Sequence, residues 1–214
     1  MNRLVIVDDH PLMREGQARA LDSEMDLDVV AQYESAEDLL EEIDDLEIDL
    51  AIVDISLPGM SGLELIKHLQ SLEPDLPIVV LSRHDEKLYA ERVIRAGARG
   101  YVMKDEPSET MVKAVRRVLD GGVFVSDEMT DRVLMSMASG GKNQIGASPL
   151  EVLSDRELEV FELIGRGFGT SEIAERMHIG VKTVGSYRRR IKDKLNLEGG
   201  SELTRQAVQW VESE

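Results

Sequence analysis

The stretch Leu4-Val5-Ile6-Val7-Asp8-Asp9 is a short apolar run that ends abruptly in two carboxylates, and this pattern decides the fold. Four more β-branched runs follow it along the chain, at residues 29–33, 50–55, 78–82 and 100–103. The segments between them carry apolar residues at three- and four-residue spacing, which is typical of amphipathic helices. Five alternations of strand and helix predict an α/β domain with a doubly wound, five-stranded parallel sheet and helices on both faces.

The composition excludes cysteine chemistry and gives no sign of a membrane segment. The 214 residues are 42% apolar and 31% charged, which is typical of globular proteins, and the chain is long enough for two domains. No apolar run approaches the roughly 20 residues of a membrane span, and the first run ends in two aspartates, unlike a secretion signal. We therefore expect a cytoplasmic protein with no membrane partner. Because cysteine is absent, any metal must be held by oxygen or histidine ligands.

Two domains are expected, joined by a linker. Residues 1–122 would form the α/β domain, residues 123–148 a linker with a short helix over 127–138, and residues 149–214 a smaller domain. The Ser, Gly and Asn content of residues 139–146 is typical of a flexible tether. Every element predicted beyond it is a helix, at 154–165, 171–177, 181–195 and 201–211.

The net charge of −17, taken alone, argues against nucleic acid as a partner, because a polyanion repels an acidic surface. The charge is unevenly distributed, however. From residue 149 onward ten Lys and Arg stand against twelve Asp and Glu, so this part carries only −2 and residues 1–148 carry −15. Residues 182–194 hold six basic residues and one acidic residue, a local charge of +5. One face of the second domain is therefore expected to be basic.

Polar side chains end four of the five predicted strands, at the sheet edge where open α/β proteins bind ligands. Asp8 and Asp9 follow the first strand, Asp54 ends the third, Ser82 ends the fourth and Lys104 follows the fifth. Adjacent carboxylates repel one another, so we expect Asp8 and Asp9 to hold a hard cation, most simply Mg²⁺. A carboxylate beside Mg²⁺ can attack phosphorus. We predict that Asp54 is phosphorylated, that Lys104 pairs with the phosphoryl group and that the Ser82 hydroxyl hydrogen-bonds to it.

Each of these residues also has an ordinary structural interpretation when it is taken singly. An isolated aspartate at a strand end, a solvated loop lysine and a serine that caps a helix are all common in α/β proteins. The functional interpretation depends on five suitable residue types at four strand ends, a combination that chance rarely supplies.

Three stretches of the first domain resemble the receiver domain of two-component response regulators, which has a flavodoxin-like fold. They are Val7-Asp8-Asp9-His10-Pro11, residues 53–62 and residues 97–104, and the resemblance covers residues 3–121. It implies that Asp54 accepts a phosphoryl group from the phosphohistidine of a histidine kinase. It also implies that Asp9, Asp54 and the Ser56 carbonyl hold Mg²⁺, with Asp8 nearby.

The same resemblance implies a conformational switch. In it the Ser82 hydroxyl moves to the phosphoryl group and the Tyr101 ring rotates inward behind it, although Tyr101 by itself would pass for an ordinary strand residue. One position departs from the family, which usually has a small residue after the hydroxyl, whereas this chain has Arg83 followed by His84. We expect these two residues to modulate the lifetime of the phosphorylated state.

The segment 181–195 is predicted to be a helix with a basic surface that enters the major groove of DNA. Val184, Ile191 and Leu195 fall on one side of it and form a core stripe. Ser186 and Arg189 can hydrogen-bond base edges while the flanking cations pair with phosphates. A solvated basic face without a partner is the structural alternative. The expected DNA contacts are Lys182, Thr183, Ser186, Tyr187, Arg188, Arg189, Arg190, Lys192 and Lys194.

The second domain resembles the LuxR-type output domain, a four-helix helix-turn-helix module, over about residues 149–211. The matching stretches are Leu153-Ser154-Asp155-Arg156-Glu157, Glu172-Ile173-Ala174, Val181-Lys182-Thr183-Val184 and Lys194-Leu195. Together the two resemblances indicate the NarL/FixJ class of response regulators. They imply that the unphosphorylated receiver obstructs the basic helix, and that phosphorylation favours its release and homodimerisation on paired half-sites. Gly185 stands where the family commonly has a base-reading side chain, which suggests close backbone approach or relaxed specificity.

Two other functions stay open at this point. The acidic pocket would also suit an aspartate-based phosphohydrolase, although such enzymes typically carry a second Asp two residues past the nucleophile, where this chain has Ser56. A phosphorylated adaptor that controls a protein partner is the other alternative. We rank both below a transcription regulator, and we expect no enzymatic activity beyond the receiver's own phosphorylation and slow dephosphorylation.

Overall fold

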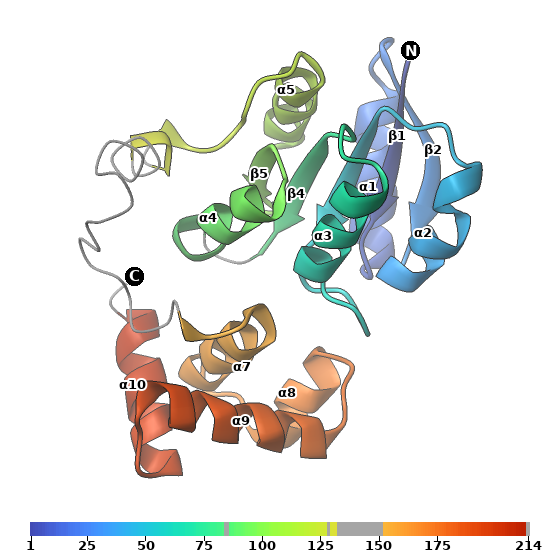
Figure 1. Ribbon diagram of the computed structural model, residues 1–214. Coiled ribbons are helices and arrows are strands. Elements are labelled where there is room, and N and C mark those ends of the chain that lie inside the picture. Colours follow the sequence, from blue (N-terminus) through green and yellow to red (C-terminus); the bar gives the residue numbers. More distant parts are fainter. Residues whose placement is uncertain (84–85, 128, 132–151, 213–214) are drawn as a thin grey trace. The chain divides into compact units, whose positions relative to one another are not determined.

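The computed structural model describes residues 1–83, 86–127, 129–131 and 152–212 (Figure 1). The chain divides into two compact units, Met1–Gly141 and Lys142–Glu214. The predicted tether, most of the helix predicted over 127–138, and His84 lie outside the described residues. The predicted domain limits at 122 and 149 therefore stay predictions.

The first unit contains a five-stranded parallel sheet in the order β2-β1-β3-β4-β5, which confirms the predicted fold class. Its strands are β1 (Asn2–Val7), β2 (Leu27–Tyr33), β3 (Leu50–Asp54), β4 (Ile78–Ser82) and β5 (Gly100–Met103). Its helices are α1 (Pro11–Asp22), α2 (Ala36–Glu42), α3 (Gly62–Leu72), α4 (Glu86–Ala96) and α5 (Ser108–Leu119), with a turn of 3-10 helix at Ile43–Asp45.

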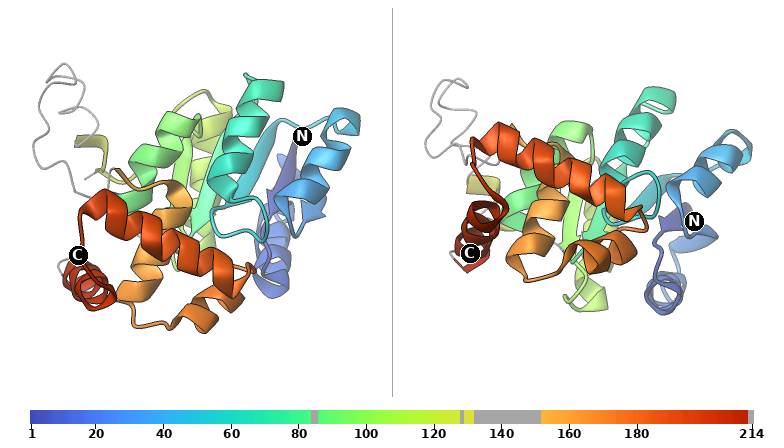
Figure 2. Two further views of the ribbon diagram at one scale, coloured as in Figure 1. Left: turned by 60° about the horizontal axis from the view of Figure 1, so that its bottom comes forward. Right: turned by 90° about the horizontal axis from the view of Figure 1, so that it is seen from below.

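Helices cover both faces of this sheet (Figure 1 and Figure 2). On one face α1 and α5 contact each other and share a core with alternate strand residues, among them Leu4, Ile6 and Ile52. On the other face α3 and α4 are neighbours. Every residue of β3 and β4 is buried, which explains why both strands are almost entirely apolar in sequence.

The parallel register brings the carboxyl ends of the central strands to one edge of the sheet. Val7 pairs with Val53, and Asp54 pairs with Leu81, so β1, β3 and β4 end at nearly the same level. Ser82 in turn pairs with Met103 of β5. The polar residues at the ends of these strands are therefore held side by side.

The chain beyond α5 returns to the edge of the sheet, an arrangement that the sequence did not predict. The Tyr101 N–H donates to the Phe124 carbonyl at 2.8 Å, and the Phe124 N–H donates to the Arg99 carbonyl at 2.9 Å. Two residues later, the Ser126 N–H donates to Oε1 of Glu86 at 2.8 Å. The start of the connection to the second unit is thus attached both to β5 and to α4.

The second unit is all helical in the part that the structure describes. Its helices are α7 (Asp155–Gly165), α8 (Thr170–Arg176), α9 (Val181–Leu195) and α10 (Gly200–Glu212). α7 packs against α9 and α10, and the rings of Phe161 and Trp210 lie 5.6 Å apart. α8 and α9 contact each other across a short turn and form the predicted helix-turn-helix. Within the described ranges, no helix of either unit is long and apolar enough to cross a membrane.

Candidate functional site

The carboxylates of the first and third strands meet at the carboxyl edge of the sheet, where both contact one lysine. Nζ of Lys104 lies 2.7 Å from Oδ2 of Asp8 and 2.7 Å from Oδ2 of Asp54. All three side chains are almost completely buried, with at most 4% of their surface exposed. Two buried carboxylates therefore share a single ammonium group, and this leaves an excess of negative charge in a site of low dielectric.

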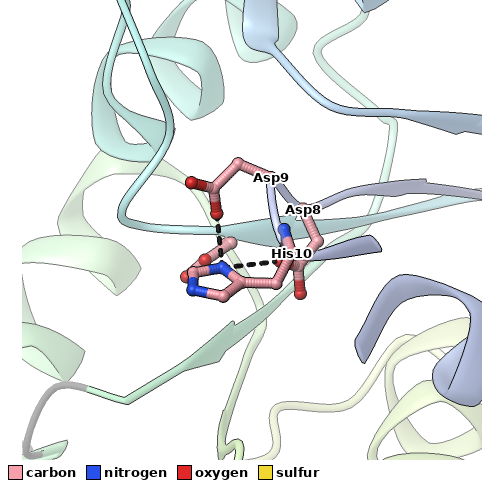
Figure 3. A group of neighbouring side chains, drawn as sticks. Asp8, Asp9 and His10 are labelled. Carbon is pink, nitrogen blue, oxygen red and sulfur yellow. Dashed lines mark hydrogen bonds and ion pairs between the residues drawn. The ribbon is translucent and has the colours of Figure 1, made fainter. Parts of the chain in front are cut away.

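Asp9 and His10 bring two further metal-ligating side chains to this site (Figure 3). Nδ1 of His10 lies 2.6 Å from Oδ1 of Asp9 and 3.5 Å from Oδ1 of Asp8. One ligand atom from each of Asp8, Asp9, His10 and Asp54 lies within 4.8 Å of the others, a spacing that one cation can bridge. Sequence reasoning assigned the three aspartates to this site but gave His10 no role.

The loop after β3 is shaped around Asp54. The Ser56 N–H donates to Oδ1 of Asp54 at 3.3 Å, so the Ser56 backbone lies beside the carboxylate, and the metal-ligand role of its carbonyl stays a prediction. At the start of α3, the Gly62 N–H donates to the Ile55 carbonyl at 2.9 Å. A Cβ atom at position 62 would lie only 1.9 Å from the Asp54 carbonyl oxygen, so only glycine fits this close approach.

The two residues of the predicted switch are both buried. Ser82 is 0% exposed at the end of β4, and its carbonyl accepts a hydrogen bond from the Lys104 N–H at 2.7 Å. Tyr101 in β5 is 2% exposed, so its ring lies in the interior. The movement of these side chains on phosphorylation stays a prediction.

Arg83 lies beside the site, immediately after β4. Its side chain is exposed. A cavity of about 320 Å³ is lined by Met13, Arg83, Met103, Lys104 and Asp105. Arg83 therefore shares a solvent-accessible space with the lysine that contacts Asp54, and its effect on phosphoryl lifetime stays a prediction.

One buried residue of this site was missed by the sequence reasoning. Gln17 on α1 is 8% exposed, and its Nε2 donates to Oδ2 of Asp8 at 3.2 Å. It lies on the buried side of α1 together with Ala18 and Leu21. A polar residue on the apolar face of a predicted helix was the one pattern in the sequence that could have identified it.

On the second unit, α9 presents a basic surface. Val184 and Ile191 are buried, as predicted, whereas Leu195 is only half-buried. The exposed residues of the predicted DNA-contacting surface are Lys182, Thr183, Ser186, Arg189, Arg190 and Lys194, and the half-buried ones are Tyr187, Arg188 and Lys192. Apart from Lys194, none of these basic residues forms an ion pair with a described residue, so their charge is available to a polyanion.

Lys194 is held differently from the other cations of α9. Its Nζ lies 2.6 Å from Oε2 of Glu157, whose side chain is 3% exposed. The same oxygen accepts a hydrogen bond from the Ser154 N–H at 2.7 Å, in the capping box that begins α7. Burial would raise the pKa of Glu157, but the hydrogen bonds from Lys194 and Ser154 outweigh it and hold that pKa below its ordinary value. Lys194 thus joins α9 to α7, and a DNA contact by this residue stays a prediction.

Gly185 is not required by the packing of α9. A Cβ atom at this position would meet nothing within 4 Å among the described atoms of the unit. Near it, the Ser186 hydroxyl donates to the Lys182 carbonyl at 3.1 Å, one turn earlier in the same helix, so this hydroxyl is bonded to its own helix backbone. Close approach of DNA and relaxed specificity both stay predictions for Gly185.

Two family models match the chain, one in each unit. The response regulator receiver domain matches residues 4–116, which include Asp8, Asp54, Ser82 and Lys104. The luxR family of bacterial regulatory proteins matches residues 151–207, which include α8 and α9.

Known relatives and solved structures agree with both matches. The oxygen regulatory protein NreC of Staphylococcus carnosus is 33% identical over 209 residues, which are 96% of each chain. RcsB of Salmonella enterica serovar Typhimurium, bound to a promoter in the presence of the phosphomimetic BeF3−, has a TM-score of 0.65 and 26% identity over 100% of this chain and 99% of that one. The receiver domain of the putative response regulator NarL from Mycobacterium tuberculosis has a TM-score of 0.53 and 34% identity over 56% of this chain and 97% of that one. The chain therefore belongs to the response regulator family, in the class that joins a receiver domain to a LuxR-type DNA-binding domain.

Proposed function

We propose that this chain is a transcription regulator whose binding to DNA is controlled by phosphorylation of Asp54. The observation that carries the proposal is the contact of Asp54 with Lys104 at 2.7 Å, beside Asp8, at the carboxyl edge of the receiver sheet. A carboxylate at this edge, next to a buried ammonium group, is placed to accept a phosphoryl group whose charge the ammonium then offsets. The similarity to RcsB, which was solved on a promoter with a phosphomimetic, supports joining phosphorylation to DNA binding.

The proposed cofactor is Mg²⁺. Asp8, Asp9 and Asp54 bring three negative charges and Lys104 brings one positive charge. The site therefore has an excess of two negative charges, which a divalent cation neutralises. The aspartates and the Ser56 carbonyl would hold the ion, because Mg²⁺ prefers hard oxygen ligands. When bound, it would offset charge on the phosphoryl oxygens during transfer.

In the proposed reaction, a carboxylate oxygen of Asp54 attacks the phosphorus of a phosphohistidine on a sensor histidine kinase. A P–O bond to Asp54 forms as the P–N bond to the kinase imidazole breaks, and the leaving imidazole takes up a proton. Lys104 pairs with the transferring group, and the Ser82 hydroxyl donates a hydrogen bond to it once it is attached. Beyond this transfer and the slow hydrolysis of its own acyl phosphate, the receiver acts on no other substrate.

The second half of the proposed function depends on α9. Its cations without ion-pair partners among the described residues bind DNA phosphates, while Ser186 and Arg189 contact base edges in the major groove. Phosphorylation favours exposure of this surface and homodimerisation, so that two copies occupy paired half-sites in the cytoplasm.

The test compares Asp54→Asn with the unmodified chain on an operator selected from a pool of random duplexes. With Mg²⁺ and acetyl phosphate as donor, we expect the unmodified chain to bind the operator more tightly at fixed salt, and Asp54→Asn to show no gain. Asp44→Asn, at an exposed aspartate, is the matched control and should gain affinity normally. A gain for Asp54→Asn equal to that of the control would refute the assignment of Asp54.

The same preparations distinguish the alternatives. Sustained release of phosphate from small phosphate esters would identify a phosphohydrolase, whereas a receiver is labelled once and loses its label slowly. Failure of the chain to bind any duplex in a salt-sensitive manner would favour an adaptor that acts on a protein partner.

A further inference from the structure

We propose that Gln17 is a positioning residue for phosphoryl acceptance, which keeps Asp8 in place when Lys104 moves to the phosphoryl group. This role rests on the proposed function of Asp54. Two buried groups contact Oδ2 of Asp8: Nζ of Lys104 forms an ion pair with it at 2.7 Å, and Nε2 of Gln17 donates a hydrogen bond to it at 3.2 Å. Gln17 therefore stands beside Lys104 as the second donor to the same carboxylate oxygen.

The amide of Gln17 is oriented by Asp8 alone. Its Oε1 is buried and accepts no hydrogen bond from any described residue. Turned the other way, the amide would bring Oε1 against the Asp8 carboxylate, which has no proton to donate when it is ionised. Gln17 also lines a largely apolar cavity of about 190 Å³ between α1 and α5, where a polar group is costly to bury. The bond to Asp8 is thus the interaction that accounts for a glutamine at this position.

The sharing of Lys104 explains why a second donor is needed. The ammonium lies 2.7 Å from both Asp8 and Asp54, so it serves two carboxylates at once. A phosphoryl group on Asp54 adds negative charge and draws the ammonium toward it. Asp8, which is 1% exposed, then loses its ion pair at Oδ2, and the donors that remain to its carboxylate are the His10 N–H, at Oδ1, and the Gln17 amide, at Oδ2. Each donor that a buried carboxylate loses is costly. Gln17 continues to donate to Oδ2 in that state, which lowers the free energy needed to release Lys104.

Removal of Nε2 should therefore weaken binding of a phosphoryl group more than binding of the cation alone. Gln17→Met keeps the side-chain volume and removes the donor. In the full-length chain at saturating Mg²⁺, we expect its affinity for beryllofluoride, measured by ¹⁹F NMR, to fall about tenfold, the effect of losing one hydrogen bond to a charged group. Its affinity for Mg²⁺ alone, measured by calorimetry, should change less than about twofold, because Lys104 then stays on Asp8.

Gln206→Met is the matched control. Gln206 on α10 also has a buried Oε1 without a partner among the described residues, but it lies in the other unit, so both affinities should stay unchanged. Unweakened beryllofluoride binding by Gln17→Met, or an equal loss of both affinities, would overturn the role, since an equal loss indicates a structural defect. If Gln17→Met does not fold, Gln17→Leu, which also lacks the donor and adds no charge, replaces it, with the same expectation and the same refuting outcomes. If the unmodified chain binds no beryllofluoride, the proposed function fails instead.

Discussion

Replacement of Lys194 by methionine should destabilise the second unit. The variant keeps the aliphatic part of the side chain and removes the ammonium group that lies 2.6 Å from Oε2 of buried Glu157. A hydrogen bond to a charged group contributes about 1.5–3 kcal/mol. Because Lys194 is 40% exposed and Glu157 keeps its hydrogen bond from Ser154, the loss should lie low in this range, at about 2 kcal/mol.

Trp210 makes this loss measurable in the full-length chain. It is the one tryptophan of the sequence, and its ring packs 5.6 Å from Phe161 within the second unit, so its fluorescence follows the unfolding of that unit. For a small unit that loses about 1 kcal/mol of stability per molar urea, the unfolding midpoint of Lys194→Met should fall by about 2 M. Lys192→Met, on the same helix, is the control. Lys192 forms no ion pair with a described residue, so its midpoint should move by less than about 0.5 M.

The pH dependence of stability gives a second measurement of the same contact. The pKa of Glu157 is lowered from 4.5 in the folded state, so folding favours its carboxylate form. The resulting stabilisation is fully present above pH 4.5 and is lost as the pH falls through the lowered folded value. The unmodified chain should therefore lose stability on acidification in this range, and Lys194→Met should lose less. Equal urea midpoints for Lys194→Met and Lys192→Met at neutral pH would refute the reasoning.

Three further substitutions have expected outcomes. Gly185→Ala should stabilise the second unit by about 1 kcal/mol in urea unfolding, because glycine weakens a helix interior and the added Cβ meets nothing. A fall in DNA affinity in the same variant would indicate close approach of the duplex, and a loss of stability would contradict the expectation. Gly62→Ala should cost the receiver about 3 kcal/mol, because its Cβ would lie 1.9 Å from the Asp54 carbonyl oxygen, and an unchanged melting curve by circular dichroism would argue against this. Arg83→Ala should speed the loss of phosphate, because it opens the cavity that Arg83 shares with Lys104, and an unaltered decay time course would remove Arg83 from the mechanism.

The receiver strands could be predicted closely because strands buried on both faces have an apolar sequence with sharp ends. The runs at 78–82 and 100–103 coincide with β4 and β5 residue for residue. β1 and β2 each begin two residues before the predicted start, at Asn2 and Leu27, because the added residues include the polar, half-buried Asn2, Arg3 and Asp28, which interrupt the apolar pattern. The convergence of Asp8, Asp54 and Lys104 followed from the topology, since parallel strands bring their carboxyl ends together.

Contacts between residues on distant elements could not be predicted in the same way. Lys194 and Glu157 are 37 positions apart, and each has a sufficient local explanation, as a basic residue of α9 and as part of a capping box. Gln17 reaches Asp8 only because α1 packs against the sheet. The periodicity of a sequence reports which side of an element is buried, but it does not report which side chain of another element will meet it.

The return of the chain to β5 after α5 links two elements of the receiver to the first residues of the interdomain connection. β5 is an edge strand, and the Phe124 pairing occupies backbone groups that would otherwise stay open to pairing with another chain. The Tyr101 N–H donates one of these hydrogen bonds, to the Phe124 carbonyl. Two residues further on, the Ser126 N–H donates to the Glu86 side chain at the start of α4. A shift of the Tyr101 backbone or of α4 must either break these hydrogen bonds or carry the first residues of the interdomain connection along with it.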